Sequence, residues 1–309
     1  MSDPRPRHTV AVLAAAVLWG TTGTVAHFAP AGSSPLLIGM ATFGFGGLVL
    51  AAISWRAVAR VLRDRRAWGW LLAGAAGAVL YPTAYYPAMD LAGVAVGNVL
   101  ALGSGPIFAA ALEWALDRRR PTARWGVATT IAALGVAALA VGSGESTTGS
   151  NPIAGILLAL AAGVGYALYS YAGARLIAGG RSSQGSMASI FLVAALVMLP
   201  LLVVLGPGPL ASVHGALTLA YLALVPMAGS YLLFGFALRA LTASTATTLA
   251  LAEPVVATLL AVAVVQERLS AIAWLGLAAV AVGIVLVSVP VPRRDRRQGP
   301  RLARARPPA

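Results

Sequence analysis

The chain has 309 residues, of which 59% are hydrophobic and only 10% are charged, and its mean hydropathy is +0.84. This composition excludes a soluble globular domain and indicates a polytopic membrane protein. The sequence contains no cysteine, which excludes a disulfide framework, a thiol nucleophile and a thiolate metal site.

Apolar runs long enough to cross a hydrocarbon core of about 30 Å follow one another along the whole chain. The loops between them are short, and a Gly-Pro-Gly-Pro turn at 206–209 separates two of the runs. No soluble domain is left to hold an enzyme active site. The sequence therefore predicts an all-α fold of ten transmembrane helices, at residues 9–29, 35–54, 67–88, 91–113, 124–143, 152–177, 186–205, 214–237, 242–265 and 271–290.

Two stretches of this chain, 148 residues apart, repeat one pattern. The first contains Pro106, Arg120, Thr122 and Gly135, and the second contains Pro254, Arg268, Ser270 and Gly283. Five spans per half is an odd number, so the second half must enter the membrane in the opposite direction, which makes the repeat inverted. Inverted repeats are typical of secondary transporters. The predicted organisation is an N-terminus at 1–8, five-helix repeats at 9–143 and 152–290, and a basic tail at 291–309.

The arginines predict the orientation of the chain. All 22 basic residues are arginine, and with the N-terminus inside, every one except Arg268 falls on the cytoplasmic side. The positive-inside rule therefore predicts a multi-pass cell-membrane protein whose N- and C-termini are both cytoplasmic. The basic tail suits contact with anionic lipid and lacks the interleaved aromatics of a nucleic-acid-binding segment, so we expect no nucleic-acid partner. Glu113 and Asp117, at a span end beside arginines, are predicted to form interfacial ion pairs.

One carboxylate, Glu253, lies about midway along the ninth predicted span. It precedes Pro254, which has no N–H to donate to the carbonyl of Ala250. Ionisable groups at this depth are costly and often functional. Two interpretations are open: Glu253 couples transport to protons or cations or contacts a substrate amine, or it is a protonated structural residue that bonds to a neighbouring helix or steadies the kink.

Polar and aromatic side chains at membrane depth supply the candidate substrate-binding residues. Tyr81 and Tyr85 are four residues apart and share one helix face, as do Tyr166 and Tyr169. Such amphipathic rings suit a small zwitterionic or aromatic solute, although Tyr is also common at membrane interfaces and in helix packing. The remaining candidates are polar or amphipathic residues whose competing role is bonding within and between helices: Trp19, Thr24, Asn98 and Thr248.

Motifs for catalysis are missing from the sequence. Gly103-Ser104-Gly105 superficially suggests a serine site, but Leu102 stands where a Gly-x-Ser-Gly pattern needs glycine. The chain has no HExxH motif and no paired-aspartate motif. We therefore expect a protein without enzyme activity, metal or cofactor.

Several of these features together resemble the EamA branch of the drug/metabolite transporter superfamily. They are Trp19-Gly20, the Pro106 helix with the loop 118–120 after it, and the block from Glu253 to Gly283. The resemblance implies a ten-helix inverted-repeat carrier in the cytoplasmic membrane, usually an exporter of amino acids, other small metabolites or drugs. In the second span this chain has Thr42 and Phe43 where many members place an arginine, so an anion-binding role is not carried over to that span.

These observations lead us to expect a secondary active carrier that moves a small-molecule substrate by alternating access, with proton or cation coupling through Glu253. A lipid flippase and a non-transporting membrane partner are the alternatives, since the same fold could serve either. The residues are compatible with a monomer and with a homodimer. They do not choose between an amino acid and a drug, and export rests on the resemblance.

Overall fold

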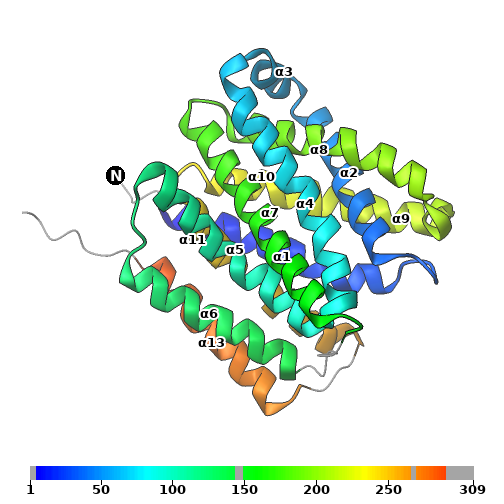
Figure 1. The fold of residues 1–309 in the computed structure, drawn as a ribbon, viewed down its shortest axis with the longest axis vertical. Coiled ribbons are helices and arrows are strands. Elements are labelled where there is room, and N and C mark those ends of the chain that lie inside the picture. Colours follow the sequence, from blue (N-terminus) through cyan, green and yellow to red (C-terminus); the bar gives the residue numbers. More distant parts are fainter. Residues whose placement is uncertain (1–4, 143–148, 266–268, 290–309) are drawn as a thin grey trace, which may run out of the picture.

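The computed structural model describes residues 5–142, 149–265 and 269–289, and every regular element in these ranges is a helix (Figure 1). The first half contains α1 (Arg5–His27), α2 (Pro35–Ile53), α3 (Trp55–Arg63), η1 (Arg65–Ala67), α4 (Trp68–Ala92), α5 (Val94–Asp117) and α6 (Ala123–Gly142). The second half contains α7 (Pro152–Ala178), α8 (Ser183–Leu205), η2 (Gly208–Ala211), α9 (Val213–Leu222), η3 (Ala223–Gly229), α10 (Ser230–Ala237), α11 (Ala243–Ala250), α12 (Glu253–Leu260), η4 (Ala261–Val265) and α13 (Ala271–Ser288).

The all-α polytopic fold is confirmed. Within the described ranges, nine helical segments are long and apolar enough to cross a membrane, and two of them are composite: α9, η3 and α10 form one, and α11 and α12 with most of η4 form the other. The remaining predicted span, the third at 67–88, corresponds to α4, a helix of 25 residues. It is less apolar than the others because it carries the Tyr81-Pro82-Thr83 and Tyr85-Tyr86-Pro87 segments.

The two halves are related by inversion, as the odd number of spans per half predicts. Equivalent helices α6 and α13 pack against each other in opposite directions: a Cβ at Gly135 would lie 2.7 Å from the backbone nitrogen of Val280, while Gly142 abuts Ala273. Residue numbers therefore rise along α6 as they fall along α13. Figure 1 shows this pair along the lower left edge, apart from α2 and α8.

A short helix, α3, occupies the arginine-rich stretch that the sequence analysis treats as a loop. Val58 and Val61 are three residues apart and both are buried, so the segment has an apolar face that packs on α8 while its arginines point outward. After it, the indole N–H of Trp68 donates to the carbonyl of Leu62 at 3.1 Å. This segment is therefore an amphipathic helix lying on the end of the bundle.

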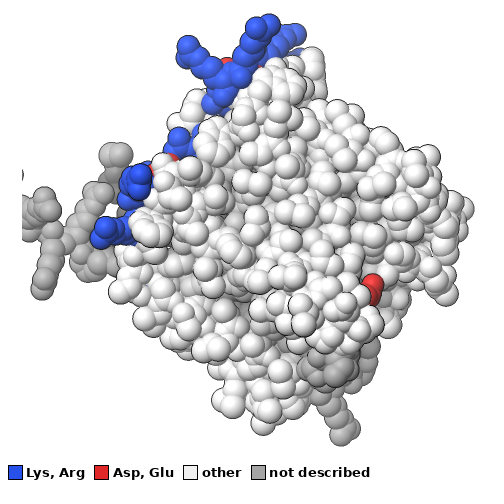
Figure 2. All heavy atoms as spheres, viewed as in Figure 1, with Lys and Arg blue, Asp and Glu red and all other residues white. Residues whose placement is uncertain are grey.

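Described arginines gather at one end of the bundle, along the upper left edge in Figure 2. Two of them form ion pairs with carboxylates on other elements: Arg175 with Asp117, and Arg181 with Asp64. We call this end of the bundle, which contains Arg175 and Arg181, the arginine end. Asp117 thus forms the expected kind of interfacial contact, but its partner is on α7 and not among the arginines that follow it.

The predicted ion pair of Glu113 is wrong. Its side chain is buried, and its carboxylate accepts hydrogen bonds from the backbone N–H of Ser244 at 3.0 Å and from the Ser244 hydroxyl at 2.6 Å. Ser244 lies in the first turn of α11, where backbone N–H groups have no partner within the helix. A buried carboxylate from the opposite half satisfies one of them, and for this reason Glu113 faces a helix end and no guanidinium.

Candidate functional site: a cavity between the two halves

A cavity of about 360 Å³ lies between the two halves of the bundle. The first half contributes residues from α1, α2, α4 and α5, and the second contributes residues from α7, η3, α10 and α12. Seven of the nine proposed site residues are among its lining, and the two exceptions are Thr24 and Thr248. The lining side chains that carry polar or aromatic groups are Trp19, Thr22, Thr42, Phe43, Tyr81, Tyr85, Tyr86, Asn98, Tyr166, Tyr169, Tyr231 and Glu253.

Stacked tyrosines form one wall of the cavity. Tyr81 and Tyr85 stack with ring centroids 5.3 Å apart, as their four-residue spacing on α4 predicts. Tyr166 lies 5.8 Å from Tyr81 and 5.4 Å from Tyr169, so the two pairs from α4 and α7 meet as one cluster. Their phenol groups give an otherwise apolar wall a few hydrogen-bonding positions.

Two side-chain hydrogen bonds hold this wall together. The hydroxyl of Tyr85 donates to the amide oxygen of Asn98 at 2.8 Å, joining α4 to α5. The hydroxyls of Tyr169 and Tyr231 lie 2.8 Å apart, joining α7 to α10. Because polar groups in a membrane interior are costly to leave unpaired, these contacts also fix the directions in which the rings point.

Glu253 faces the cavity at a break in the ninth span. Helix α11 ends at Ala250 and α12 begins at Glu253, followed at once by Pro254, which lines the cavity too. The eighth span is also irregular there, since Pro226 lies in the π-helical turn η3 and reaches the same cavity. Interrupted helices at membrane depth are characteristic of binding sites in carriers.

The charge of the cavity is one-sided. Among its lining residues Glu253 is the single acidic side chain, and the lining contains no Arg, Lys or His. In the described part of the chain no hydrogen bond and no ion pair reaches the Glu253 carboxylate. The carboxylate therefore has no fixed counterion from the described residues.

The inverted repeat does not place a second carboxylate opposite the first. At the repeat distance of 148 residues, Glu253 corresponds to Gly105 in α5. A Cβ at Gly105 would lie 2.6 Å from Cδ1 of Tyr166, so the tyrosine ring occupies the space that a side chain would need. The two halves therefore do not contribute equal charge to the cavity.

The cavity lies in the half of the membrane region away from the arginine end. It is lined by residues 19–26 of α1 and 81–89 of α4, which belong to the helix halves farther from that end. On the side of the cavity toward the arginines, aromatic rings pack together: the ring centroid of Tyr231 is 4.2 Å from that of Phe191 and 5.2 Å from that of Trp19.

Two of the proposed substrate-binding residues lie outside the cavity. Thr248 is fully buried, its hydroxyl 3.0 Å from that of Thr129 on α6 and donating to the carbonyl of Ser244 at 2.8 Å. Thr24 is not among the lining residues, whereas Thr22 is. Positions two apart on a helix point about 200° from each other, so composition alone does not choose between these threonines.

The sequence alone does not predict that some of the lining residues belong to the cavity. Tyr231 shares its apolar span with Tyr221, ten residues earlier, and no helical spacing distinguishes it from a packing residue. Thr42 and Phe43 do carry a signal, because the sequence departs there from the pattern it resembles, and both line the cavity. The hydroxyl of Thr42 is buried without a hydrogen-bond partner.

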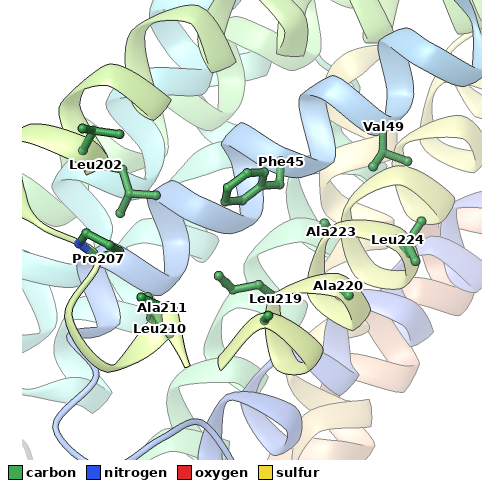
Figure 3. Close-up of a pocket in the computed structure, with 12 residues that line it drawn as sticks. Phe45, Val49, Leu202, Pro207, Leu210, Ala211, Leu219, Ala220, Ala223 and Leu224 are labelled. Carbon is green, nitrogen blue, oxygen red and sulfur yellow. The ribbon is translucent and has the colours of Figure 1, made fainter. Parts of the chain in front are cut away.

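A larger hollow of about 570 Å³ lies elsewhere, between α2, α8, α9 and η3. Figure 3 shows Phe45 and Val49 of α2 facing Leu219 and Ala223 across it. All twelve lining residues are apolar, so this groove offers a polar solute no hydrogen-bonding or charged side chain. The smaller central cavity is for that reason the better candidate site.

Comparisons with known proteins agree with this architecture. The EamA-like transporter family matches the chain twice, at residues 8–141 and 153–289. An uncharacterized transporter, YwfM of Bacillus subtilis (strain 168), is 34% identical over 291 residues, covering 94% of this chain and 96% of the relative. A solved crystal structure with 22% identity superposes with a TM-score of 0.77, covering 91% of this chain and 96% of that one, and supports the fold.

Proposed function

The chain belongs to the EamA-like transporter family, and from this premise we propose that it is a secondary active carrier that exports small metabolites or drugs across the cell membrane by alternating access. The observation that carries the proposal is the central cavity. It lies between two inverted halves and contains a carboxylate and hydrogen-bonding groups at membrane depth. These are the features that a carrier needs to hold a solute midway across a bilayer.

The positive-inside rule favours a cytoplasmic position for the arginine end. On that assignment the aromatic rings around Tyr231 lie between the cavity and the cytoplasm, as expected of an outward-facing state. The opposite access state requires the rings of Tyr231, Phe191 and Trp19 to move apart. The contacts of Glu113 with Ser244 and of Asp117 with Arg175 lie at the same end, so they must open or move as well.

Glu253 is the group that we propose for coupling. It is the single acidic side chain lining the cavity, and it lies at the junction of α11 and α12. A carboxylate there can take up a proton or a cation in one access state and release it in the other. Loss of the carboxylate would then uncouple solute movement from the gradient without closing the route.

Counterflow in proteoliposomes tests the carrier proposal. Vesicles containing the purified protein are loaded with an unlabelled amino acid, amine or sugar, and uptake of the same labelled solute is followed without any gradient. Stimulated uptake of some solute is expected for the wild type and for Glu253→Gln, but only the wild type should concentrate that solute when a pH gradient is imposed.

A matched control is Asp90→Asn, which removes one carboxylate from an exposed position on α4 outside the cavity lining and should leave both activities intact. If folded protein exchanges no water-soluble solute, the carrier proposal is wrong, and assays with labelled lipids become the next test. If Glu253→Gln concentrates its solute as the wild type does, the coupling role is wrong.

A further inference from the structure

Resting on the proposed function, we propose that the cavity selects organic cations with a compact apolar or aromatic body, and that it discriminates against zwitterionic and anionic solutes. The substrate class follows from the balance of charge and aromatic surface within the cavity. The lining contains no basic side chain that would attract a negatively charged group.

The cavity lining carries one carboxylate and no basic side chain. Glu253 is the single lining residue with an ionisable acidic or basic group other than the tyrosine phenols, and no described cation lies in the lining to neutralise it. A solute ammonium would supply the missing counterion. A solute carboxylate would instead enter a poorly hydrated space beside a like charge, with no guanidinium or ammonium to receive it.

A solute carboxylate would need hydrogen-bond donors in the lining. The Tyr169 and Tyr231 hydroxyls bond to each other, and the Tyr85 hydroxyl donates to Asn98. Two of these three hydroxyl protons are thus used within the wall, and the hydroxyl donors that remain, such as Thr42, carry no charge to balance a carboxylate. The space opposite Glu253 in the repeat, at Gly105, is filled by the ring of Tyr166.

The aromatic side chains of the lining suit an apolar solute body. Aromatic residues from five elements line the cavity, among them Trp19, Phe43, Tyr81 and Tyr86. Ring faces attract ammonium groups, and this attraction grows where water is excluded. At about 360 Å³ the cavity is near the lower end of the roughly 300–1,000 Å³ seen for ligand pockets, which favours a solute of about one ring.

A matched set of four probes tests the proposal, each with one phenyl ring and a two-carbon linker or close equivalent. They are 2-phenylethyltrimethylammonium, phenylalanine, 3-phenylpropionate and 2-phenylethanol. Equilibrium dialysis against the full chain in lipid nanodiscs measures their affinities. The cation is expected to bind at least about tenfold more tightly than the zwitterion and the anion, the lower end of the scale of one close contact between opposite charges.

Variants then locate the preference. Glu253→Gln is expected to weaken binding of the ammonium probe about tenfold or more while leaving 2-phenylethanol unchanged. Glu253→Asp keeps the charge and should keep the preference, as should the Asp90→Asn control. The proposal is overturned if the wild type prefers phenylalanine or 3-phenylpropionate, or if folded Glu253→Gln keeps its preference for the cation. Should a Glu253 variant not fold, the ranking by the wild type decides.

Transport assays separate this inference from the carrier proposal. If the ammonium probe binds but no solute undergoes counterflow, the cation site stands and the carrier proposal fails. If a zwitterion or anion undergoes counterflow and the ammonium probe neither binds nor exchanges, the carrier proposal stands and the cation site is wrong.

Discussion

The Glu113 carboxylate, at the end of α5, caps the start of α11 through Ser244, with oxygen-to-donor distances of 3.0 Å to the N–H and 2.6 Å to the hydroxyl. The two residues belong to opposite halves of the inverted repeat. One buried side chain thus performs two tasks: it satisfies a helix terminus, and it joins the halves at the arginine end.

Replacing Glu113 by alanine should destabilise the protein. The change leaves the Ser244 N–H and hydroxyl without their acceptor in a buried site, which costs about 1–3 kcal/mol. Thermal unfolding of the detergent-purified protein, followed by the monodisperse fraction, measures the loss. Ser244→Ala should cost less because its N–H bond survives, and the double variant should lose less than the sum of the two. Additive losses would contradict the direct contact.

The chain is a natural background for cysteine labelling because it contains no cysteine. Met89 lines the cavity and Arg60 lies on α3 at the opposite, arginine end. On the proposed orientation, Met89→Cys should react with a membrane-impermeant maleimide added to intact cells. Arg60→Cys should react only after permeabilisation. The reverse pattern would place the arginine end outside and refute the assigned topology.

Contact between α6 and α13 should tolerate no side chain at Gly135. A Cβ there would lie 2.7 Å from the Val280 nitrogen and 2.8 Å from the Gly276 oxygen, so backbone must shift. Gly135→Ala is expected to lower stability by about 1–3 kcal/mol, the usual cost of overpacking. Gly126→Ala, on the same helix with nothing within 4 Å of the added Cβ, is the control and should be nearly neutral. Equal melting temperatures for the two variants would disprove the close approach.

The Asp64–Arg181 ion pair should make stability depend on acid. Its hydrogen bond from Arg181 is the main cause that lowers the pKa of Asp64 below 3.8, with a further contribution from the Arg66 N–H. A depressed folded-state pKa means that the contribution is present above the ordinary value and is lost as pH falls through the folded value. Asp64→Asn should therefore melt earlier than wild type at about pH 7, and the difference should shrink progressively as the pH is lowered below 3.8.

The difference in melting temperature between Asp64→Asn and the wild type should be small, since the site is exposed and exposed ion pairs contribute little. High salt should reduce the difference at neutral pH. An Asp64→Asn difference that grows on acidification would contradict the assigned ion pair.

The sequence predicts the helices of this protein better than it predicts which faces meet. Apolar runs reveal spans because a membrane demands length and hydrophobicity, and spacing on one helix places Tyr81 with Tyr85 and Tyr166 with Tyr169. The break at Pro254 follows from its missing N–H. These are local properties, and each can be read from a few neighbouring residues.

Contacts between distant helices leave no comparable local signal. Thr248 could face a cavity or another helix, and only the packing of α6 against α11 turns its hydroxyl toward Thr129. Glu113 looks like an interfacial acid beside arginines until α11 is placed over it. Tyr231 joins the site because α10 brings it to Tyr169, 62 positions earlier in the chain.

Gly105 and Glu253 stand at equivalent positions in two nearly interchangeable halves. A duplicated, inverted backbone tends to give the two access states similar conformational energies, because each half can adopt the shape of the other. Glu253 makes the two halves unequal, because the first half has Gly105 at the equivalent position. When the halves exchange conformations, the carboxylate stays in the second half, and the equivalent space in the first half holds the Tyr166 ring. On the proposed coupling role of Glu253, this one side chain gives the two access states different affinities for a proton or cation, so that an imposed gradient can drive net transport in one direction.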